Sequence, residues 1–287
     1  MASVAQGPNT KIFAEDWAQR LQDQLDEPNK FKEICDVEFT DFYTLNRPYH
    51  VDGTVATLNP GTAYTLAGIA ETNETLTVNQ HGIRANFIDQ AALLQFSYLK
   101  QMEMATRHAV TLNEDIETKV YADFANWTTF DGANIGGSAG SITVSATNID
   151  DIITGIVREI REANGESLLE RNGGFIVWRP ADFELLQRFM MANGFNMADQ
   201  TLRNGTVQGI RYMGIAHYSS NLLTAQHVMA GVKKIYSVGI LRATYGQVKV
   251  NDSDPNLLSG LSVVSRVDFG VKAWNNTKTC LFNVLVV

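Results

Sequence analysis

The sequence predicts a mixed α+β protein with a long helical stretch, a projecting β-hairpin and a strand-rich final third. Residues 83–131 contain neither glycine nor proline, which favours long helices. Residues 42–87 are rich in Thr, Val, Tyr, Asn and Gly, a composition typical of strands and turns. With 287 residues, 45% of them hydrophobic, the chain can form one large domain or two closely joined domains around a substantial core.

The N-terminal segment predicts a helix that begins at Asn9 or Thr10 and ends before Pro28. One apolar side chain recurs every four residues along it, at Phe13, Trp17, Leu21 and Leu25. Such a narrow stripe needs a partner surface, which is either the core of the same chain or a neighbouring subunit.

Residues 42–87 predict a long polar β-hairpin that projects from the body. Turn signals lie at 59–61 and 79–82, and residues 75–78 alternate as strand residues do. The stretch has few large hydrophobic side chains, so it cannot build a core of its own. An isolated two-stranded ribbon is marginally stable in water, so we expect this hairpin to rest on another surface.

The glycine-free stretch predicts a helix over residues 88–109 and a second helix that opens with Thr111 and Glu114 in capping-box spacing. The second helix has a regular apolar stripe of Leu112, Ile116, Val120 and Phe124. The glycine-rich segment 132–140 that follows is typical of a hinge between two subdomains.

The next block alternates helix and strand. A helix begins near Asn148 and stops at Gly165, residues 175–178 form an apolar central strand, and a helix opens with Pro180 and ends at Asn193. Strands then dominate, over residues 210–217, 228–238, 240–250, 261–274 and 279–286.

The charge, hydropathy and cysteine content argue against a nucleic-acid-binding, secreted, membrane-spanning or metal-binding protein. The formal net charge is -8 and the pI about 5.1, so the surface as a whole repels nucleic acid. Residues 1–10 do not have the pattern of a secretory signal, and no stretch is apolar enough to span a bilayer, so we expect a soluble protein made in a reducing cytoplasm. Cys35 and Cys280 lack nearby metal-ligand partners and are expected to be reduced, partly buried thiols.

No motif predicts a catalytic residue, a cofactor or a metal. The glycines at 136–140 precede strand-like residues 142–144 and no lysine is near, unlike a phosphate-binding loop. Asp150 and Asp151 are adjacent at a helix start, where their negative charges interact favourably with the helix dipole. Asp252 and Asp254 mimic the start of a calcium loop that lacks its glycine and distal glutamate.

The order of the elements resembles the Hong Kong 97-like capsid fold of tailed bacteriophages over nearly the whole chain. That order is an N-terminal helical arm, a long hairpin, a long helix, a glycine-rich break, an α/β block and a strand-rich tail. Five segments carry the resemblance: residues 83–99 leading into the family's spine helix, 148–191 around Gly173–Pro180 of the axial domain, the strands 209–222 and 228–234, and the closing peripheral segment 267–274.

The resemblance implies a division into an N-terminal arm (1–41), an extended β-hairpin loop (42–87), a peripheral domain with the spine helix (88–147 and 240–274) and an axial domain (148–239 and 275–287). It also implies a function. The chain would be a major capsid protein that self-assembles as hexamers and pentamers into an icosahedral shell. That shell would enclose phage double-stranded DNA without sequence-specific binding, and the protein would be found in the virion after assembly in the host cytoplasm.

The same resemblance implies contacts between copies rather than an active site. The hairpin would lie over the next subunit, and the polar loop 193–208 would sit at the five- and six-fold axes. The interface candidates are Trp17, Arg47, Asn59, Gly61, Tyr64, Glu71, Arg84, Asn193, Gly194, Asn204, Asp252 and Asp254. Other implied partners are a scaffolding protein, a portal protein and a decoration protein, with no membrane and no cofactor.

Two features depart from well-known members of the family. Some members weld the shell through a hairpin lysine, whereas no lysine lies between Lys32 and Lys100 here, so we expect a non-covalent lattice. A long helical N-terminal extension that serves as a fused scaffold is absent, so assembly would use a separate scaffolding protein or none. Two alternatives stay open: an encapsulin-type shell that encloses cargo proteins, and a soluble oligomeric enzyme whose site is assembled from dispersed residues.

Overall fold

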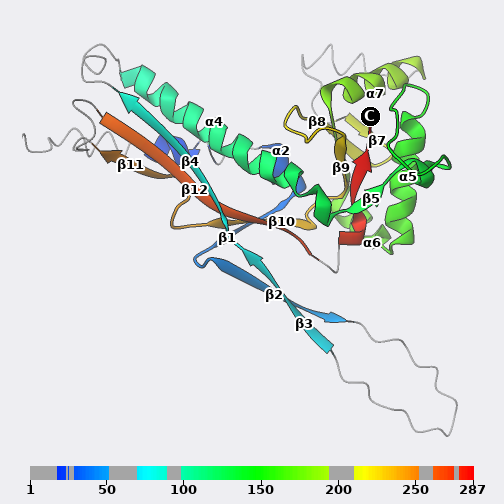
Figure 1. The fold of residues 1–287 in the computed structure, drawn as a ribbon, viewed down its shortest axis with the longest axis horizontal. Helices are drawn as coiled ribbons and strands as arrows, with labels where there is room; N and C mark the ends of the chain where they lie inside the picture. Colours follow the sequence, from blue (N-terminus) through cyan, green and yellow to red (C-terminus); the bar gives the residue numbers. More distant parts are fainter. Residues whose placement is uncertain are drawn as a thin grey trace, which may run out of the picture.

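The computed structural model describes residues 18–23, 25, 29–51, 70–88, 98–193, 210–251, 261–274 and 278–287. Figure 1 shows a five-stranded sheet beside the long helix α4, a six-stranded sheet surrounded by shorter helices, and a two-stranded ribbon that projects away from both. The described helices include none with the length and apolar character needed to span a membrane.

The five-stranded sheet is built around the long strand β12 (Leu261–Ala273). Strands β10 (Tyr236–Leu241) and β11 (Gln247–Asn251) pair end to end along one edge of β12, and β4 (Gln80–Ile88) pairs along the other edge. Strand β1 (Asp36–Thr40) adds to β10 in the parallel direction and follows the short helix α2 (Lys30–Ile34).

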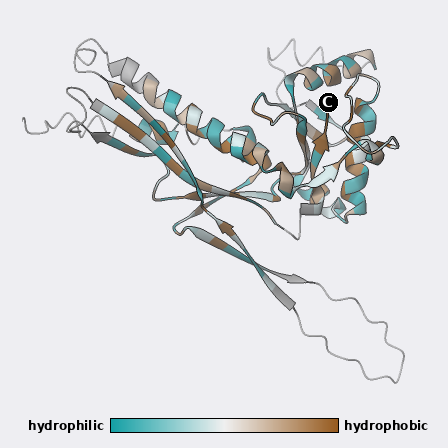
Figure 2. Cartoon of the chain, viewed as in Figure 1, coloured by the Kyte–Doolittle hydropathy of each residue, from teal (hydrophilic) through white to brown (hydrophobic). Residues whose placement is uncertain are grey.

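Helix α4 (Tyr98–Ala122) covers one face of this sheet. Its buried side chains recur at helical spacing: Ala105, Ala109, Leu112, Ile116 and Val120. In Figure 2 teal and brown segments alternate along the helix, as expected when one face is buried. On the buried side His108 Nδ1 lies 2.9 Å from Ser265 Oγ of β12.

The sequence-based prediction of two helices is wrong at this position, because α4 runs unbroken through residue 111. The Thr111 hydroxyl donates to the Arg107 carbonyl oxygen one turn earlier, at 2.9 Å, instead of capping a new helix. The predicted start at residue 88 is also wrong, because Ile88 ends strand β4. Residues 89–97 lie outside the described residues.

The six-stranded sheet has the strand order β5-β13-β9-β6-β8-β7. Its members are β5 (Thr128–Phe130), β13 (Leu281–Leu285), β9 (His227–Val232), β6 (Gly174–Trp178), β8 (Ile215–Ser219) and β7 (Ile210–Tyr212). All five residues of β6 are buried, as the prediction of a central strand requires.

Three helices accompany this sheet: α5 (Ile149–Glu162), α6 (Glu166–Asn172) and α7 (Pro180–Ala192). The expected helix starts near Asn148 and at Pro180 are confirmed. Three short 3₁₀ segments complete the described helical structure: η1 (Phe124–Asn126), η2 (Gly132–Ile135) and η3 (Lys278–Cys280).

Several predicted boundaries need correction. The predicted strand 210–217 is two strands, because Met213 and Gly214 form a turn with positive φ angles of 52° and 80°. The predicted strand 228–238 is likewise divided, at Lys234, where φ is 63°. Helix α2 and strand β1 were not predicted.

Two strands lie in the other sheet from the one predicted. β5 belongs to the six-stranded sheet through β13, although the predicted peripheral domain extends to residue 147. β10 belongs to the five-stranded sheet, although the predicted axial domain extends to residue 239. The segment 132–140 is therefore not a hinge between the sheets, because Ile142, which follows it, bridges Val286 next to β13.

The projecting ribbon pairs β2 (Thr44–Val51) with β3 (Ala70–Thr77), in a register that places Thr44 opposite Thr77 and Val51 opposite Ala70. The predicted hairpin is thus observed, but it is shorter than the predicted range 42–87, because the chain continues directly into β4 of the body. The predicted N-terminal helix is described only in part: residues 18–23 and 25 are helical, and Leu21 and Leu25 are fully buried in the main core of the same chain.

Candidate assembly surfaces

Arg47 ties the root of the ribbon to the body. Its guanidinium donates to Asp36 Oδ2 at 2.9 Å and to Glu38 Oε1, both on β1, and it lies 5.0 Å from the centre of the Trp274 ring. Burial raises the pKa of Glu38 above its ordinary value, although Arg47 opposes this. A charged and aromatic contact therefore joins the ribbon to two separate parts of the five-stranded sheet.

A small apolar cluster lies beside this contact. Leu76 and Val78 pack against Leu241 and Trp274, and Leu45 borders them. The Trp274 indole N–H donates to Ser237 Oγ at 2.8 Å, so the ring is held in place by the sheet beneath it. This cluster is separate from the main core and stabilises only the root of the ribbon.

Two glycines of the five-stranded sheet allow the ribbon to approach that sheet closely. A Cβ on Gly239 would lie 2.6 Å from Leu76 Cδ2, and a Cβ on Gly270 would lie 2.1 Å from the Thr77 carbonyl oxygen. Both glycines lie inside strands, where their usual significance is a close approach of another chain segment. The packing thus fixes the root of the ribbon on the outer face of the sheet, opposite α4.

Beyond this root the ribbon leaves the body (Figure 1). Thr72, Asn73, Thr75 and Thr77 are exposed, and cross-strand contacts such as the Thr75 hydroxyl donating to Asn46 Oδ1 at 2.7 Å are on its surface. The described part of the chain offers no layer that covers it. A ribbon of this kind gains stability when another surface covers it.

Large apolar side chains are exposed on the five-stranded sheet and on the turn that precedes the ribbon. On β4, Ile83 is 59% and Phe87 49% exposed, and their pairing with Arg266 and Ser262 places them on the sheet face opposite α4. Phe42 (74%) and Tyr43 (55%) are exposed at the turn between β1 and β2. Exposed apolar side chains that gather in one patch are typical of protein–protein contact surfaces.

A charged group lies on the same sheet face. Arg266 donates two hydrogen bonds to the buried Asp268 carboxylate, at 2.8 and 2.7 Å, and His81 Nδ1 lies 3.0 Å from it. Burial would raise the pKa of Asp268, but the hydrogen bonds from Arg266 and His81 outweigh it and lower that pKa below its ordinary value. The Thr244 hydroxyl accepts from the Asp268 backbone N–H at 3.0 Å.

Three of the twelve predicted interface residues have described side chains. Arg47 contacts its own chain rather than standing free, Arg84 is exposed on β4, and Asn193 caps the end of α7 by donating to the Phe189 carbonyl oxygen at 2.9 Å. Glu71 is placed only as a residue of β3. The others lie outside the described residues: Trp17, Asn59, Gly61, Tyr64, Gly194, Asn204, Asp252 and Asp254.

Sequence reasoning missed the residues that fix the ribbon root, above all Leu76, Trp274 and Gly239. An available signal was Gly270, a glycine inside the alternating run of β12, which indicates close backbone approach. The partners of that glycine come from far away in the sequence, so the sequence alone could not name them.

Two histidines, His108 and His217, are buried in the body of the protein. Burial lowers the pKa of both His108 and His217 to about 4, so both rings are neutral near pH 7. The Trp178 indole N–H donates to His217 Nδ1 at 3.0 Å. Within the described ranges, His, Cys, Asp and Glu side chains form no group of three that could hold a metal ion.

Both cysteines are free, as predicted, but they are fully rather than partly buried. Burial raises the pKa of Cys35 and of Cys280, which disfavours the reactive thiolate form. Asp150 lies in the first turn of α5, as predicted, and accepts a hydrogen bond from the Tyr212 hydroxyl at 2.8 Å.

No protein-family model matches the sequence, and no curated protein matches it. Solved structures do match the fold. A structure of Mycobacterium phage Che8 has a TM-score of 0.63 at 17% identity, with 84% of each chain covered. The capsid of a native GTA particle has a TM-score of 0.64 at 13% identity, covering 90% of this chain and 89% of that one.

A virus-like particle from Pyrococcus furiosus has a TM-score of 0.58 at 10% identity, covering 95% of this chain and 99% of that one. Identities this low establish the fold alone. The chain has the Hong Kong 97-like capsid fold, and the sequence-based prediction of fold is confirmed.

Proposed function

We propose that this chain is a major capsid protein, which self-assembles as hexamers and pentamers into an icosahedral shell around the double-stranded DNA of a tailed phage. The observation that carries this proposal is a ribbon fixed at its root but uncovered beyond it, on a chain that has a capsid fold along most of its length. A ribbon of this kind is completed by a neighbouring copy, and head-to-tail contacts of one copy with the next close into rings.

In this proposal the two sheets form different contacts between copies of the chain. The six-stranded sheet with α5, α6 and α7 forms an axial domain that meets its copies around five- and six-fold axes, with the loop after Asn193 at those axes. The five-stranded sheet with α4 forms a peripheral domain that reaches toward three-fold contacts. The ribbon lies over the next subunit, where the exposed Ile83, Phe87 and Phe42 offer an apolar surface of the kind that such an arm needs.

The lattice in this proposal is non-covalent. No lysine lies between Lys32 and Lys100, so the ribbon has no amine to form an isopeptide bond. Denaturing gels of purified particles are expected to show one band at the monomer mass of 31.7 kDa, and a ladder of covalent multimers would contradict this.

The shell acts as a container rather than a catalyst. A net charge of -8 lets the wall enclose DNA without adhering to it. A separate scaffolding protein, a portal protein and a decoration protein are the partners that this role implies, with assembly in the host cytoplasm and the virion as the final location.

The test is to express the full chain alone and together with neighbouring genes, and to examine the product by sedimentation and negative-stain electron microscopy. Closed shells support the proposal, and a compact monomer with its ribbon folded onto its own body would overturn it. The contents of purified particles separate the two shell readings: nucleic acid supports a phage capsid, whereas a single enriched enzyme supports an encapsulin-type compartment.

A further inference from the structure

We propose that a pocket in the six-stranded sheet domain binds a phosphate group, held between Arg211 and Lys233. The pocket lies where α6 ends and β6 begins, and the β7–β8 turn and the turn after β9 form its other walls. Its volume is about 490 Å³, and it opens to solvent. All of the lining residues belong to one copy of the chain, so phosphate binding can be tested on the unassembled protein.

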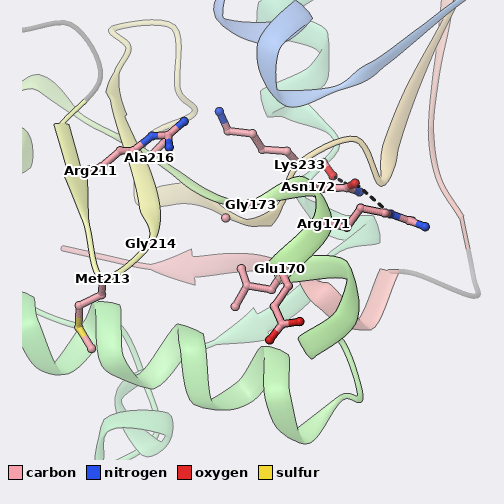
Figure 3. A pocket seen from close by; sticks show the side chains of 11 residues that line it. Glu170, Arg171, Asn172, Gly173, Arg211, Met213, Gly214, Ala216 and Lys233 are labelled. Atoms are coloured by element: carbon pink, nitrogen blue, oxygen red, sulfur yellow. Dashed lines mark hydrogen bonds between the residues drawn. The ribbon is translucent and has the colours of Figure 1, made fainter.

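Two cationic side chains converge on the pocket from different strands. Figure 3 shows Arg211 of β7 and Lys233, which follows β9, pointing toward one another above Gly173. Lys233 Nζ is steadied by the Tyr218 hydroxyl, 2.6 Å away. Arg211 is exposed, and Figure 3 shows no hydrogen bond from it to the other residues drawn, so its planar guanidinium faces the pocket without a partner among the lining residues.

The acidic residues nearby do not balance these cations. Glu170 points away on the other side of Gly173 (Figure 3), while Arg171 bonds to the neighbouring Asn172 Oδ1 at 3.3 Å. Burial lowers the pKa of Lys233 below its ordinary value; Glu33, which also hydrogen-bonds the Tyr218 hydroxyl, is the strongest charge effect and opposes this, while Arg211 and Lys234 add to it. The lining contains three cationic side chains and one acidic one, Glu170, so the pocket keeps an excess of positive charge even with Glu33 beside Lys233.

Glycines leave the backbone open to a ligand. Gly173 and Gly214 line the pocket with positive φ angles of 77° and 80°, and nothing lies within 4 Å of the position that a Cβ would occupy on either. A side chain at these positions would be strained and would project from the backbone. The backbone at these two positions thus stays accessible from the pocket.

A phosphate group fits this pocket better than a carboxylate from a neighbouring copy. A phosphate monoester carries about -1.5 to -2 charges near neutral pH, which matches two facing cations, whereas a carboxylate carries one. Arginine and lysine together provide both the planar fork and the point charge that phosphate binding uses.

The test is calorimetric titration of the full chain with inorganic phosphate, using acetate at equal ionic strength as the control anion. Saturable binding of phosphate but not acetate is expected, and Arg211→Gln should weaken it roughly tenfold or more. The matched control is Arg242→Gln, because Arg242 is an exposed arginine of the other sheet domain whose pairing with Asp41 is loose, at 3.8 Å. It should leave binding unchanged.

Competition identifies the source of the phosphate group. Displacement by a nucleoside 5′-monophosphate but not by a DNA duplex is expected, because a phosphate monoester carries about two charges and a phosphodiester one; equal displacement by the duplex would contradict the charge match. The proposal is overturned if the unaltered chain binds no phosphate saturably, if Arg211→Gln binds it as before, or if Arg242→Gln loses binding equally.

Discussion

The six-stranded sheet and the ribbon β2–β3 differ in what surrounds them. Every residue of the central strand β6 is buried, with strands on both edges and α5, α6 and α7 alongside. The ribbon has one partner strand, mostly polar side chains and no covering layer among the described residues. Among the described side chains, its contacts with the body lie at the root, at Arg47, Leu76 and the two glycines beneath them.

This difference separates two sources of stability in one chain. The sheet domain buries its own apolar surface, so its stability is a property of the monomer. The ribbon contributes little to that stability, and we infer that the ribbon itself is stabilised when another copy covers it. Changes in the sheet should therefore act on folding, and changes in the ribbon should act on assembly.

The largest expected effect is the loss of shells when the ribbon is shortened. Val51 and Ala70 lie directly opposite one another, so an Asn-Gly pair can replace residues 52–69 as a two-residue turn. We expect the free energy of unfolding to change by less than about 1 kcal/mol, because loop length affects it only weakly. Sedimentation should show that particles are absent.

A linker of glycine and serine, equal in length to residues 52–69, provides the control for that variant. It preserves reach but removes the native side chains. Particles formed by the shortened chain would contradict the division of roles described above.

The next largest expected effect is the loss of stability when a large side chain is removed from the core of the six-stranded sheet domain. Phe175 is fully buried on β6, so Phe175→Ala should lower the free energy of unfolding by about 3–5 kcal/mol. Phe42 is 74% exposed, so Phe42→Ala should change it by less than about 0.5 kcal/mol while weakening assembly. Urea unfolding measures the first effect and light scattering the second. Equal destabilisation by the two variants would remove the distinction between the regions.

An intermediate effect is expected at the ribbon root. Gly239→Ala would bring a methyl group within 2.6 Å of Leu76 Cδ2, and the required shift should cost about 1–3 kcal/mol. In a Leu76→Ala background the same change should cost at least about 1 kcal/mol less, because the contact is gone. A double-mutant cycle by urea unfolding checks this. Additive costs would show that Leu76 does not pack on Gly239.

The smallest effect is a difference in pH dependence between two carboxylates. Despite its burial, the pKa of Asp268 is lowered by Arg266 and His81, so Asp268 contributes stability above its unfolded pKa of about 3.9, and this is lost as the pH falls through the folded pKa. Burial raises the pKa of Asp123 despite the Tyr236 hydrogen bond, so its contribution has the opposite sign. Acid unfolding of Asp268→Asn should lose part of the low-pH slope, whereas Asp123→Asn should steepen it. Identical curves for both variants would contradict this assignment.

Local patterns predicted the parts of the fold that depend on neighbouring residues. The apolar face of α5, the buried run of β6 and the proline at the start of α7 each carry their own physical signal. The capping box at Thr111 misled because its hydroxyl has a competing acceptor, the Arg107 carbonyl oxygen, within a continuing helix.

Non-local pairing could not be predicted in the same way. Residues 80–88 have the texture of the hairpin, yet β12, far away in the sequence, recruits them into the body sheet. The sheets to which β5 and β10 belong were predicted wrongly for the same reason, since each strand pairs with a strand distant from it in the sequence. Of the candidate contact residues, Arg47 contacts Asp36 and Glu38 on β1 of its own chain, and its predicted role between copies stays a prediction.

The position of β13 has a consequence for the timing of synthesis. β13 lies between β5 and β9, and among the described strands it is the only one that pairs with β5. β5 therefore leaves the ribosome long before the strand that completes it, and the sheet stays open until residues 281–285 have emerged. Until then, β5 and one edge of β9 lack their partner strand in the nascent chain.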